Sequence, residues 1–398
     1  MALINGTPRF APWQTPVPGT WTAWADRYDG TPLGPVPLLA MSFGQKLSDF
    51  GTATATISTV DGGLSPDDMR RLWSWRLWLA YEGTTIWCGM PSGIVDGGTA
   101  AMSLNFTEIH GYLTRRALDI AGGWNVVQLE QTEIARQIAA PVADVGVQLV
   151  VQAASQVLRD RAYEYLEGPY RSDLMTNLAQ IGDPDHGIAQ GPEFRMEYLG
   201  TQAVLRIAYP RVGDSTAGLF LSVPGDAIEP SLTWDGDKVR TRTFAVGDAP
   251  ETDGGTTPAK PVAIVDRPQP LTPRLDQIDD WSSVTLVSTL QERANTNASI
   301  YALPVLEVKG STLESDPPVD SYNMGDDVVV SVRDPAEVEG LRATGRLVER
   351  QIDCATGKVD WTITMTVPPT LSRPNMTARM NQVTAAQAAL MRRRLTPI

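Results

Sequence analysis

Apolar and polar residues alternate at every second position through much of this chain, and this pattern constrains its fold more than any other feature. The clearest example is the stretch 52–57, in which threonines alternate with small or branched apolar residues. Such alternation is typical of a half-buried β-strand, because successive side chains of a strand point to opposite faces. We therefore expect an α+β protein that is mainly antiparallel β.

A hairpin is predicted after residue 71. The segment RLWSWRLWLAYEG places Trp73, Trp75 and Tyr81 on one face at period two, and Glu82-Gly83 then turns the chain into a partner strand, TIWCGMPSGIVD. Gly89 within that partner predicts a bulge or a close approach of another group. A third strand is expected from about residue 101 to 112.

The length of 398 residues suggests two to three domains, and 42% apolar residues are enough to bury several cores. A net charge of −13 argues against wrapping nucleic acid or lying on an anionic membrane. No apolar run is long enough for a membrane span and no signal peptide is evident, so we expect synthesis in the cytoplasm and no membrane anchor. Cys88 and Cys354 suggest neither a disulfide framework nor a metal cluster.

Helical spacing is limited to a few segments. We expect helices over 129–141 with Thr132 as N-cap, over 172–182 with Ser172 as N-cap, and around 283–296. The tail TARMNQVTAAQAALMRRR is a fourth candidate, but its apolar face is too narrow for it to fold alone, so it needs a partner.

These patterns divide the chain into seven expected parts. They are an extended Pro/Trp-rich arm, a first β domain, a helical insertion, a β region, a linker loop, a second β domain with one helix, and a C-terminal tail helix, at 1–40, 41–120, 121–190, 191–248, 249–273, 274–372 and 373–398.

No catalytic constellation emerges from the motifs. The chain has only His110 and His186, and it lacks HExxH, a Walker loop and GxSxG. Glu108 and His110 share one strand face and could form an acid–base pair, although a polar sheet face is the simpler interpretation. The segment 183–187 resembles a calcium loop but has Gly187 where an oxygen ligand is needed. We expect no catalytic, cofactor-binding or metal-binding residues.

The tryptophans and the basic C-terminus are the remaining unusual features. The tryptophans around 73–87 could form a carbohydrate platform, but their alternation favours core and interface packing. Three consecutive arginines at a chain end favour an interface role. The candidate interface residues are Trp13, Trp21, Trp24, Trp73, Trp75, Trp78, Trp87, Arg392, Arg393 and Arg394.

Taken in order, these segments resemble a known family. An early strand pair MSFGQKLSDFGTATATIS is followed by the hairpin RLWLAYEGTTIWCGMPSGI, by GYLTRRAL, and by the helices QTEIARQIA and SDLMTNLAQIGD. Later come VRTRTFAVGD, YNMGDDVVVSV and GRLVERQID. The arrangement resembles the tail hub, or baseplate hub, of long-tailed phages, of the kind called minor tail proteins in phages of actinobacteria.

This resemblance implies two tail-tube-like β-barrel or sandwich domains and a homotrimer that forms a pseudo-hexameric ring at the distal end of the tail tube. The implied partners are the distal tail protein or tube end above, central fibre or tip proteins below, and the tape-measure protein. DNA would pass through the channel without specific binding, and the acidic net charge suits such a conduit. The implied location is the virion tail tip.

Some hubs carry a peptidoglycan-cleaving module, and none is found here, so we expect no enzyme. Two alternatives stay open from the residues. One is a carbohydrate-binding tail protein that recognises host glycans through the tryptophan set. The other is a hydrolase that uses two carboxylates such as Asp183 and Asp185.

Overall fold

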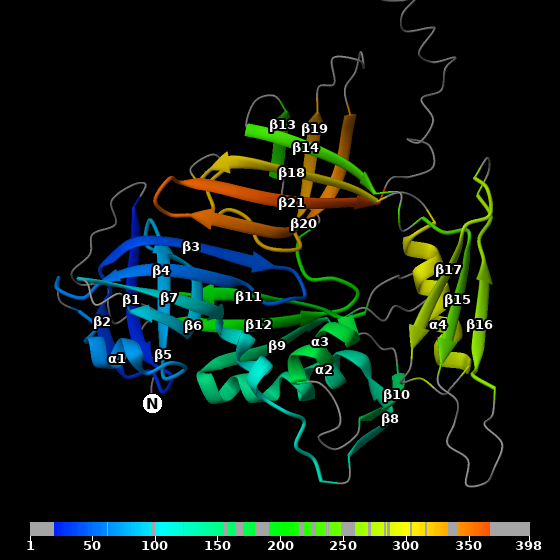
Figure 1. The fold of residues 1–398 in the computed structure, drawn as a ribbon, viewed down its shortest axis with the longest axis horizontal. Helices are drawn as coiled ribbons and strands as arrows, with labels where there is room; N and C mark the ends of the chain where they lie inside the picture. Colours follow the sequence, from blue (N-terminus) through cyan, green and yellow to red (C-terminus); the bar gives the residue numbers. More distant parts are fainter. Residues whose placement is uncertain are drawn as a thin grey trace, which may run out of the picture.

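The protein is a mainly antiparallel β structure with few helices, as expected (Figure 1). A computed structural model describes residues 20–366. It excludes the internal stretches 62, 97–99, 122, 154–157, 164–169, 180–190, 215–218, 224–227, 236, 238, 248–258, 270–271, 282–283, 285–286, 303–304, 315–316 and 333–340. No helix in these described ranges is both long and apolar enough to cross a membrane.

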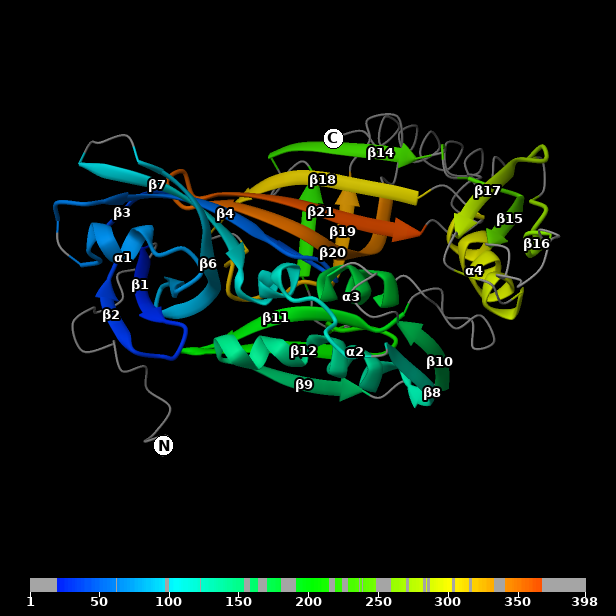
Figure 2. The same cartoon turned by 60° about the horizontal axis from the view of Figure 1, so that its bottom comes forward.

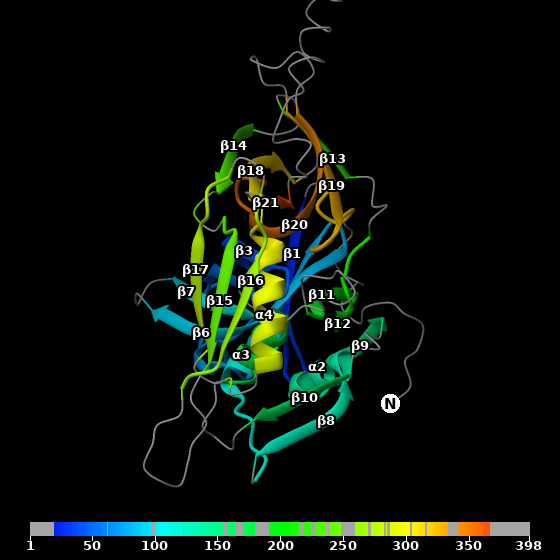
Figure 3. The same cartoon turned by 90° about the vertical axis from the view of Figure 1, so that its right-hand side faces the viewer.

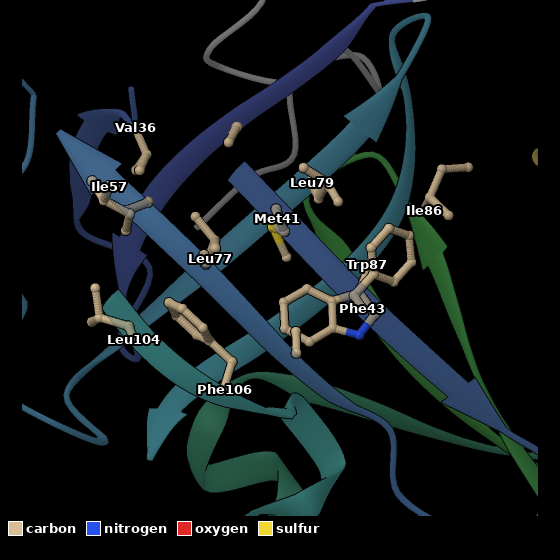
Figure 4. Packing of buried hydrophobic residues seen from close by; sticks show 14 of the residues in the cluster. Val36, Met41, Phe43, Ile57, Leu77, Leu79, Ile86, Trp87, Leu104 and Phe106 are labelled. Atoms are coloured by element: carbon tan, nitrogen blue, oxygen red, sulfur yellow. The ribbon is translucent and has the colours of Figure 1, made fainter. Parts of the chain in front are cut away.

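The first half of the main sheet, called the first block, contains seven strands and one short helix. The strands are β1 (Trp21–Arg27), β2 (Pro32–Pro35), β3 (Leu38–Lys46), β4 (Thr52–Ser58), β5 (Trp75–Tyr81), β6 (Thr84–Asp96) and β7 (Ala101–Glu108), and the helix is α1 (Pro66–Arg70). Their spatial order is β3-β4-β7-β6-β5-β1-β2. The large apolar side chains of β3 to β7 meet inside the first block (Figure 4).

Two sequence expectations for this region need correction. Residues 21–35 are not an extended arm but form β1 and β2, and β1 pairs with β5 along its whole length. The prolines are tolerated because Pro32 and Pro35 lie in the short edge strand β2, where a missing N–H breaks no ladder. The third predicted strand ends at Glu108, and the 3₁₀ helix η2 (Ile109–Arg115) follows it.

A smaller layer packs beside the first block. Its three-stranded sheet has the order β11-β12-β9, and a two-stranded sheet pairs β10 with β8. The elements are β8 (Trp124–Glu130), α2 (Gln131–Ala139), η3 (Ala140–Val145), β9 (Val147–Ala153), β10 (Leu158–Tyr163), α3 (Arg171–Ala179), β11 (Glu193–Leu199) and β12 (Gln202–Ala208). Figure 2 shows α2 beside β12 and β9.

The predicted helical insertion 121–190 is therefore a mixture of strands and helices. Helix α2 is confirmed, but its N-cap is Glu130, whose carboxylate accepts the Glu133 N–H at 3.0 Å, and not Thr132. Helix α3 begins at Arg171, one residue before the predicted cap Ser172. The predicted terminator Gly182 lies outside the described residues.

The other half of the main sheet is called the second block. It contains β13 (Leu219–Val223), β14 (Ile228–Asp235), β18 (Val305–Leu313), β19 (Asp327–Val332), β20 (Leu341–Asp353) and β21 (Lys358–Thr366). Its strand order is β14-β18-β21-β20, and β19 pairs with β20 and β13. Strand β20 also pairs with β3, so one hydrogen-bonded sheet runs through both blocks. Among the described strands neither half closes into a barrel.

A separate small unit lies at one side of the protein (Figure 1), and Figure 3 shows that side facing the viewer. It contains β15 (Arg242–Gly247), β16 (Val262–Asp266), β17 (Asp276–Trp281) and α4 (Val287–Ile300), with the sheet order β16-β15-β17. The predicted linker 249–273 therefore contains a strand, because the alternation Val-Ala-Ile-Val allows pairing with β15 between the Pro- and Gly-rich flanks.

Candidate functional site

Three of the tryptophans lie inside the protein. Trp75, Trp78 and Trp87 are at most 1% exposed. Trp75 packs edge-on against Phe106 with ring centroids 5.5 Å apart, and Trp87 contacts Phe106 as well. A ring without an exposed face cannot stack on a sugar or on a partner chain. These three residues are therefore core residues, which corrects their assignment as interface candidates and removes them from a glycan platform.

Trp78 belongs to a buried polar group that links two strands. Its indole Nε1 donates to Asp26 Oδ1 at 2.8 Å, and Arg76 forms an ion pair with the same carboxylate. Arg76 Nη1 also donates to the carbonyl of Val145 at 3.0 Å. Burial raises the pKa of Asp26, and the hydrogen bonds from Arg76 and Trp78 oppose this rise. The group fixes β1, β5 and η3 to one another.

The other candidate tryptophans in the described range, Trp21, Trp24 and Trp73, are half-buried. Trp24 stacks parallel to Trp78 at 6.2 Å, and Trp21 Nε1 donates to Glu314 Oε2 at 2.6 Å. Arg115 lies over the ring of Trp73 at 5.4 Å. Trp21, Trp24 and Trp73 keep part of their surface accessible and stay interface candidates. Trp13 and Arg392, Arg393 and Arg394 lie outside the described residues.

Glu108 and His110 do lie close together, with Glu108 Oε2 3.9 Å from His110 Nδ1. Tyr198 OH donates to Glu108 Oε1 at 2.7 Å, and the Gly51 N–H donates to Oε2 at 3.1 Å. Burial raises the pKa of Glu108 to about 7, against the opposing hydrogen bonds, and lowers the pKa of His110 to about 4. Their exposure of 2% and 1% leaves no access for a substrate, so the pair packs β7 and η2 against β11.

The most elaborate polar arrangement lies where the two blocks and β11 meet, and we call it the joint. It consists of Glu193, Arg195, Arg211, Asp326, Asp327 and Arg346. Glu193 is buried and accepts from Arg346 Nη2 at 2.8 Å and from the Val212 N–H at 3.0 Å. Arg346 also donates to the carbonyls of Val212 and Gly325 at 2.7 and 3.0 Å. The guanidinium thus ties β20 to β11 and to two loops.

The joint contains a second ion pair, between Arg195 and Asp326. Arg195 Nη1 donates to Asp326 Oδ1 at 3.0 Å and to the Met324 carbonyl at 2.8 Å. Asp326 also accepts the N–H of Asp214 at 2.9 Å. Two residues further along the same face of β11, Glu197 pairs with Arg195 and Arg206, whose hydrogen bonds outweigh burial and lower the pKa of Glu197. Arg211 pairs with Asp327 at 2.8 Å.

Backbone pairing reinforces the joint. β20 pairs with β3 from Glu349–Lys46 to Asp353–Ser42, and the Ser48 N–H donates to the Phe194 carbonyl at 2.9 Å. Arg350 Nε donates to Gln45 Oε1 at 2.8 Å. The carboxylates are paired with arginines or backbone N–H groups, so the arrangement is suited to holding elements in place rather than to chemistry.

No sequence pattern marks the joint. Asp326 and Asp327 stand in the segment YNMGDDVVVSV, and nothing near them along the chain predicts their pairing with Arg195 and Arg211. The partners in two of the joint's ion pairs are 131 and 153 residues apart along the chain, so no local spacing signals them. Within the described part of the chain no group of His, Cys, Asp or Glu could hold a metal ion. Asp183 and Asp185 lie outside it.

No protein-family model matches this chain, and no curated protein matches it by sequence. Solved structures do match. A tail protein from Neisseria meningitidis MC58 is 13% identical, with a TM-score of 0.57 over 87% of this chain and 96% of that one. The 43 kDa tail protein of prophage MuSo2 from Shewanella oneidensis is 12% identical, with a TM-score of 0.59 over 86% and 98%. Prophage tail protein gp18 from Listeria monocytogenes EGD-e is 11% identical, with a TM-score of 0.53 over 92% and 99%.

The match extends over nearly the whole of each of these three chains. At such low identity it establishes the fold, and the fold is that of these three tail proteins, two of which come from prophages. The comparison does not distinguish phages of actinobacteria from others.

Proposed function

We propose that this protein is a structural, non-enzymatic component of a phage tail, a hub at the distal end of the tail tube. The observation that carries the proposal is the shared fold with three tail proteins along 86–92% of this chain and nearly their full lengths. The polar clusters among the described residues support a structural role, because their charged groups form ion pairs with one another inside the protein.

In the proposed assembly three copies form a ring, and each copy contributes its first and second block, giving six sheet units around a channel. Such a ring requires the two blocks of one chain to keep a fixed mutual orientation. The continuous β3–β20 pairing and the joint supply that constraint. The channel would pass DNA without gripping it, which suits a net charge of −13. The distal tail protein and the central fibre or tip proteins would bind at its two ends.

The first test is the mass of the purified protein in solution, followed by cryo-electron microscopy of the tail tip. Three copies of a 43.2 kDa chain give about 130 kDa, and images are expected to show a threefold ring with a central channel. Peripheral copies, or absence from the tail axis, would refute the hub proposal. Asp67→Asn changes a side chain that is 88% exposed, and this variant is expected to form the same ring as the wild type.

A further inference from the structure

The small unit has one covered face and one open face. Helix α4 packs on β15 and β16, and the buried residues between them include Ala245, Ala263, Leu290 and Ala294. Because side chains of a strand alternate between faces, the residues on either side of Ala245 in β15 and of Ala263 in β16 point to the other side of the sheet. Within the described residues no helix or strand packs on that other side, which we call the outer face.

The outer face is apolar at its centre. Phe244 of β15 lies directly between Ile264 of β16 and Ile278 of β17. In the next row Val246 lies between Val262 and Asp280. Ile278 is 67% exposed, Val262 44% and Ile264 43%. Neighbouring apolar residues that stay exposed in register on three strands mark a binding surface.

Charged residues flank this apolar centre at both ends. At the end of the sheet where β15 begins, Asp266 pairs with Arg242 at 3.2 Å and Asp276 pairs with Arg274 at 2.8 Å, so this end is balanced in charge. Asp280 is exposed at the opposite end. The surface therefore suits an apolar segment whose positive charge lies at the Asp280 end.

The C-terminal tail has this composition. Its apolar residues recur at helical spacing, at Met376, Met380, Val383, Ala386 and Leu390. Residues 374–398 contain no Asp or Glu and carry Arg379 together with the cluster 392–394. A helix over 376–391 would be about 24 Å long, enough to cross the three rows of the outer face. Such a helix needs an apolar surface, because its own stripe cannot stabilise it alone.

The tail also starts close enough. The last described residue, Thr366, pairs with Val305, which follows the end of α4 at Ile300 by five residues. Tyr301, in the same connection, accepts the N–H of Arg240 just before β15. The nine residues 367–375 span up to about 30 Å when extended, so the tail can reach the outer face of its own chain from the end where β15 begins.

We propose that residues 376–391 of this chain dock as an amphipathic helix on its own outer face. The stripe from Met376 to Leu390 covers Phe244, Ile264 and Ile278. The helix enters beside Asp266 and Asp276, and the arginines 392–394 lie toward Asp280. The small unit then has a helix on each side of its sheet.

The test compares the labelling rate of a cysteine on the outer face in two lengths of the protein. Ile278→Cys and, separately, Val262→Cys are made in the full chain and in a chain that lacks 375–398, and maleimide addition is followed by peptide mass analysis. We expect labelling about tenfold slower in the full chain, since a docked tail blocks the thiol except when it detaches. Val60→Cys, at a 69% exposed position outside the small unit, is expected to label at the same rate in both lengths.

A substitution in the apolar stripe of the tail gives a second comparison. Leu390→Asp in the full chain is expected to restore fast labelling, because it places a carboxylate on the apolar face. Equal labelling rates in the two lengths would overturn the proposal. Protection that disappears on dilution would overturn docking within one chain and assign the occupant to the tail of a second copy.

Discussion

The buried Glu108 gives a pH dependence that can be worked out from the structure. Burial raises its pKa to about 7 in the folded protein, against 4.5 for a solvated glutamate. Between these values the unfolded chain loses a proton that the folded chain keeps, so the free energy of unfolding falls as the pH rises. The difference between the two pKa values corresponds to about 3 kcal/mol, present below pH 4.5 and lost as the pH passes 7.

His110 acts in the opposite direction. Burial lowers its pKa to about 4, against 6.5 for a solvated histidine. As the pH falls through 6.5 the unfolded chain gains a proton that the folded chain takes up only near pH 4, so this stability is lost on acidification. Between pH 4.5 and 6.5 the contributions of Glu108 and His110 therefore oppose each other.

The perturbation is Glu108→Gln, in which the amide can still accept the Gly51 N–H and can donate to the Tyr198 oxygen. The free energy of unfolding is measured by urea titration at several pH values from 4 to 8. Relative to the wild type, the variant is expected to gain about 3 kcal/mol between pH 4.5 and 7.5. His110→Phe is expected to change the profile in the opposite sense, with a relative gain toward acidic pH.

Asp67→Asn is the control, because its side chain is 88% exposed, and its profile is expected to run parallel to that of the wild type. If Glu108→Gln also runs parallel to the wild type from pH 4.5 to 7.5, the carboxyl is not held protonated by burial and the reasoning fails.

Two further predictions concern the joint. Glu193→Gln is expected to lower the free energy of unfolding by about 3–5 kcal/mol in urea, because it leaves the Arg346 guanidinium in the joint without its carboxylate. The double variant with Arg346→Met should cost less than the sum of the single changes, and additive costs would show that the pair is not coupled. Gly213→Ala is expected to destabilise by more than about 1 kcal/mol, because its φ is +101° and a Cβ would lie 2.2 Å from the Gly325 carbonyl oxygen. Gly200→Ala, with φ +63° and open space, is the control, and an equal thermal shift in the two alanine variants would contradict this account.

The parts of the fold that depend on neighbouring residues could be predicted from the sequence. The alternation at 52–57 predicted β4, and the turn at Glu82-Gly83 predicted the β5–β6 hairpin. The close approach at Gly89 is confirmed, since a Cβ there would lie 2.1 Å from the Trp87 ring. In each case the relevant contacts lie within a few residues along the chain or within one hairpin.

The burial of the tryptophans could not be predicted in the same way. The alternation placed Trp75 and Trp78 on opposite faces of a strand, and it suggested that one face was available to partners. In the structure every residue of β5 is buried, because one face packs in the first block and the other against η2, α2 and β11. Periodicity indicates a face, but it does not indicate how many layers cover the strand.

The joint could not be found from the sequence for a related reason, and it explains how one chain can hold two blocks rigidly. Strand β20 is 13 residues long. It pairs with β19 at its start and with β3 and β21 at its end. Ile352 and Val359 of the second block also belong to the core of the first block. A rotation of one block against the other would therefore break ladder hydrogen bonds, separate shared core residues and expose the Glu193–Arg346 pair at once. Since these losses occur together, the two blocks should resist relative motion as one body, which is what a ring built from two units per chain requires.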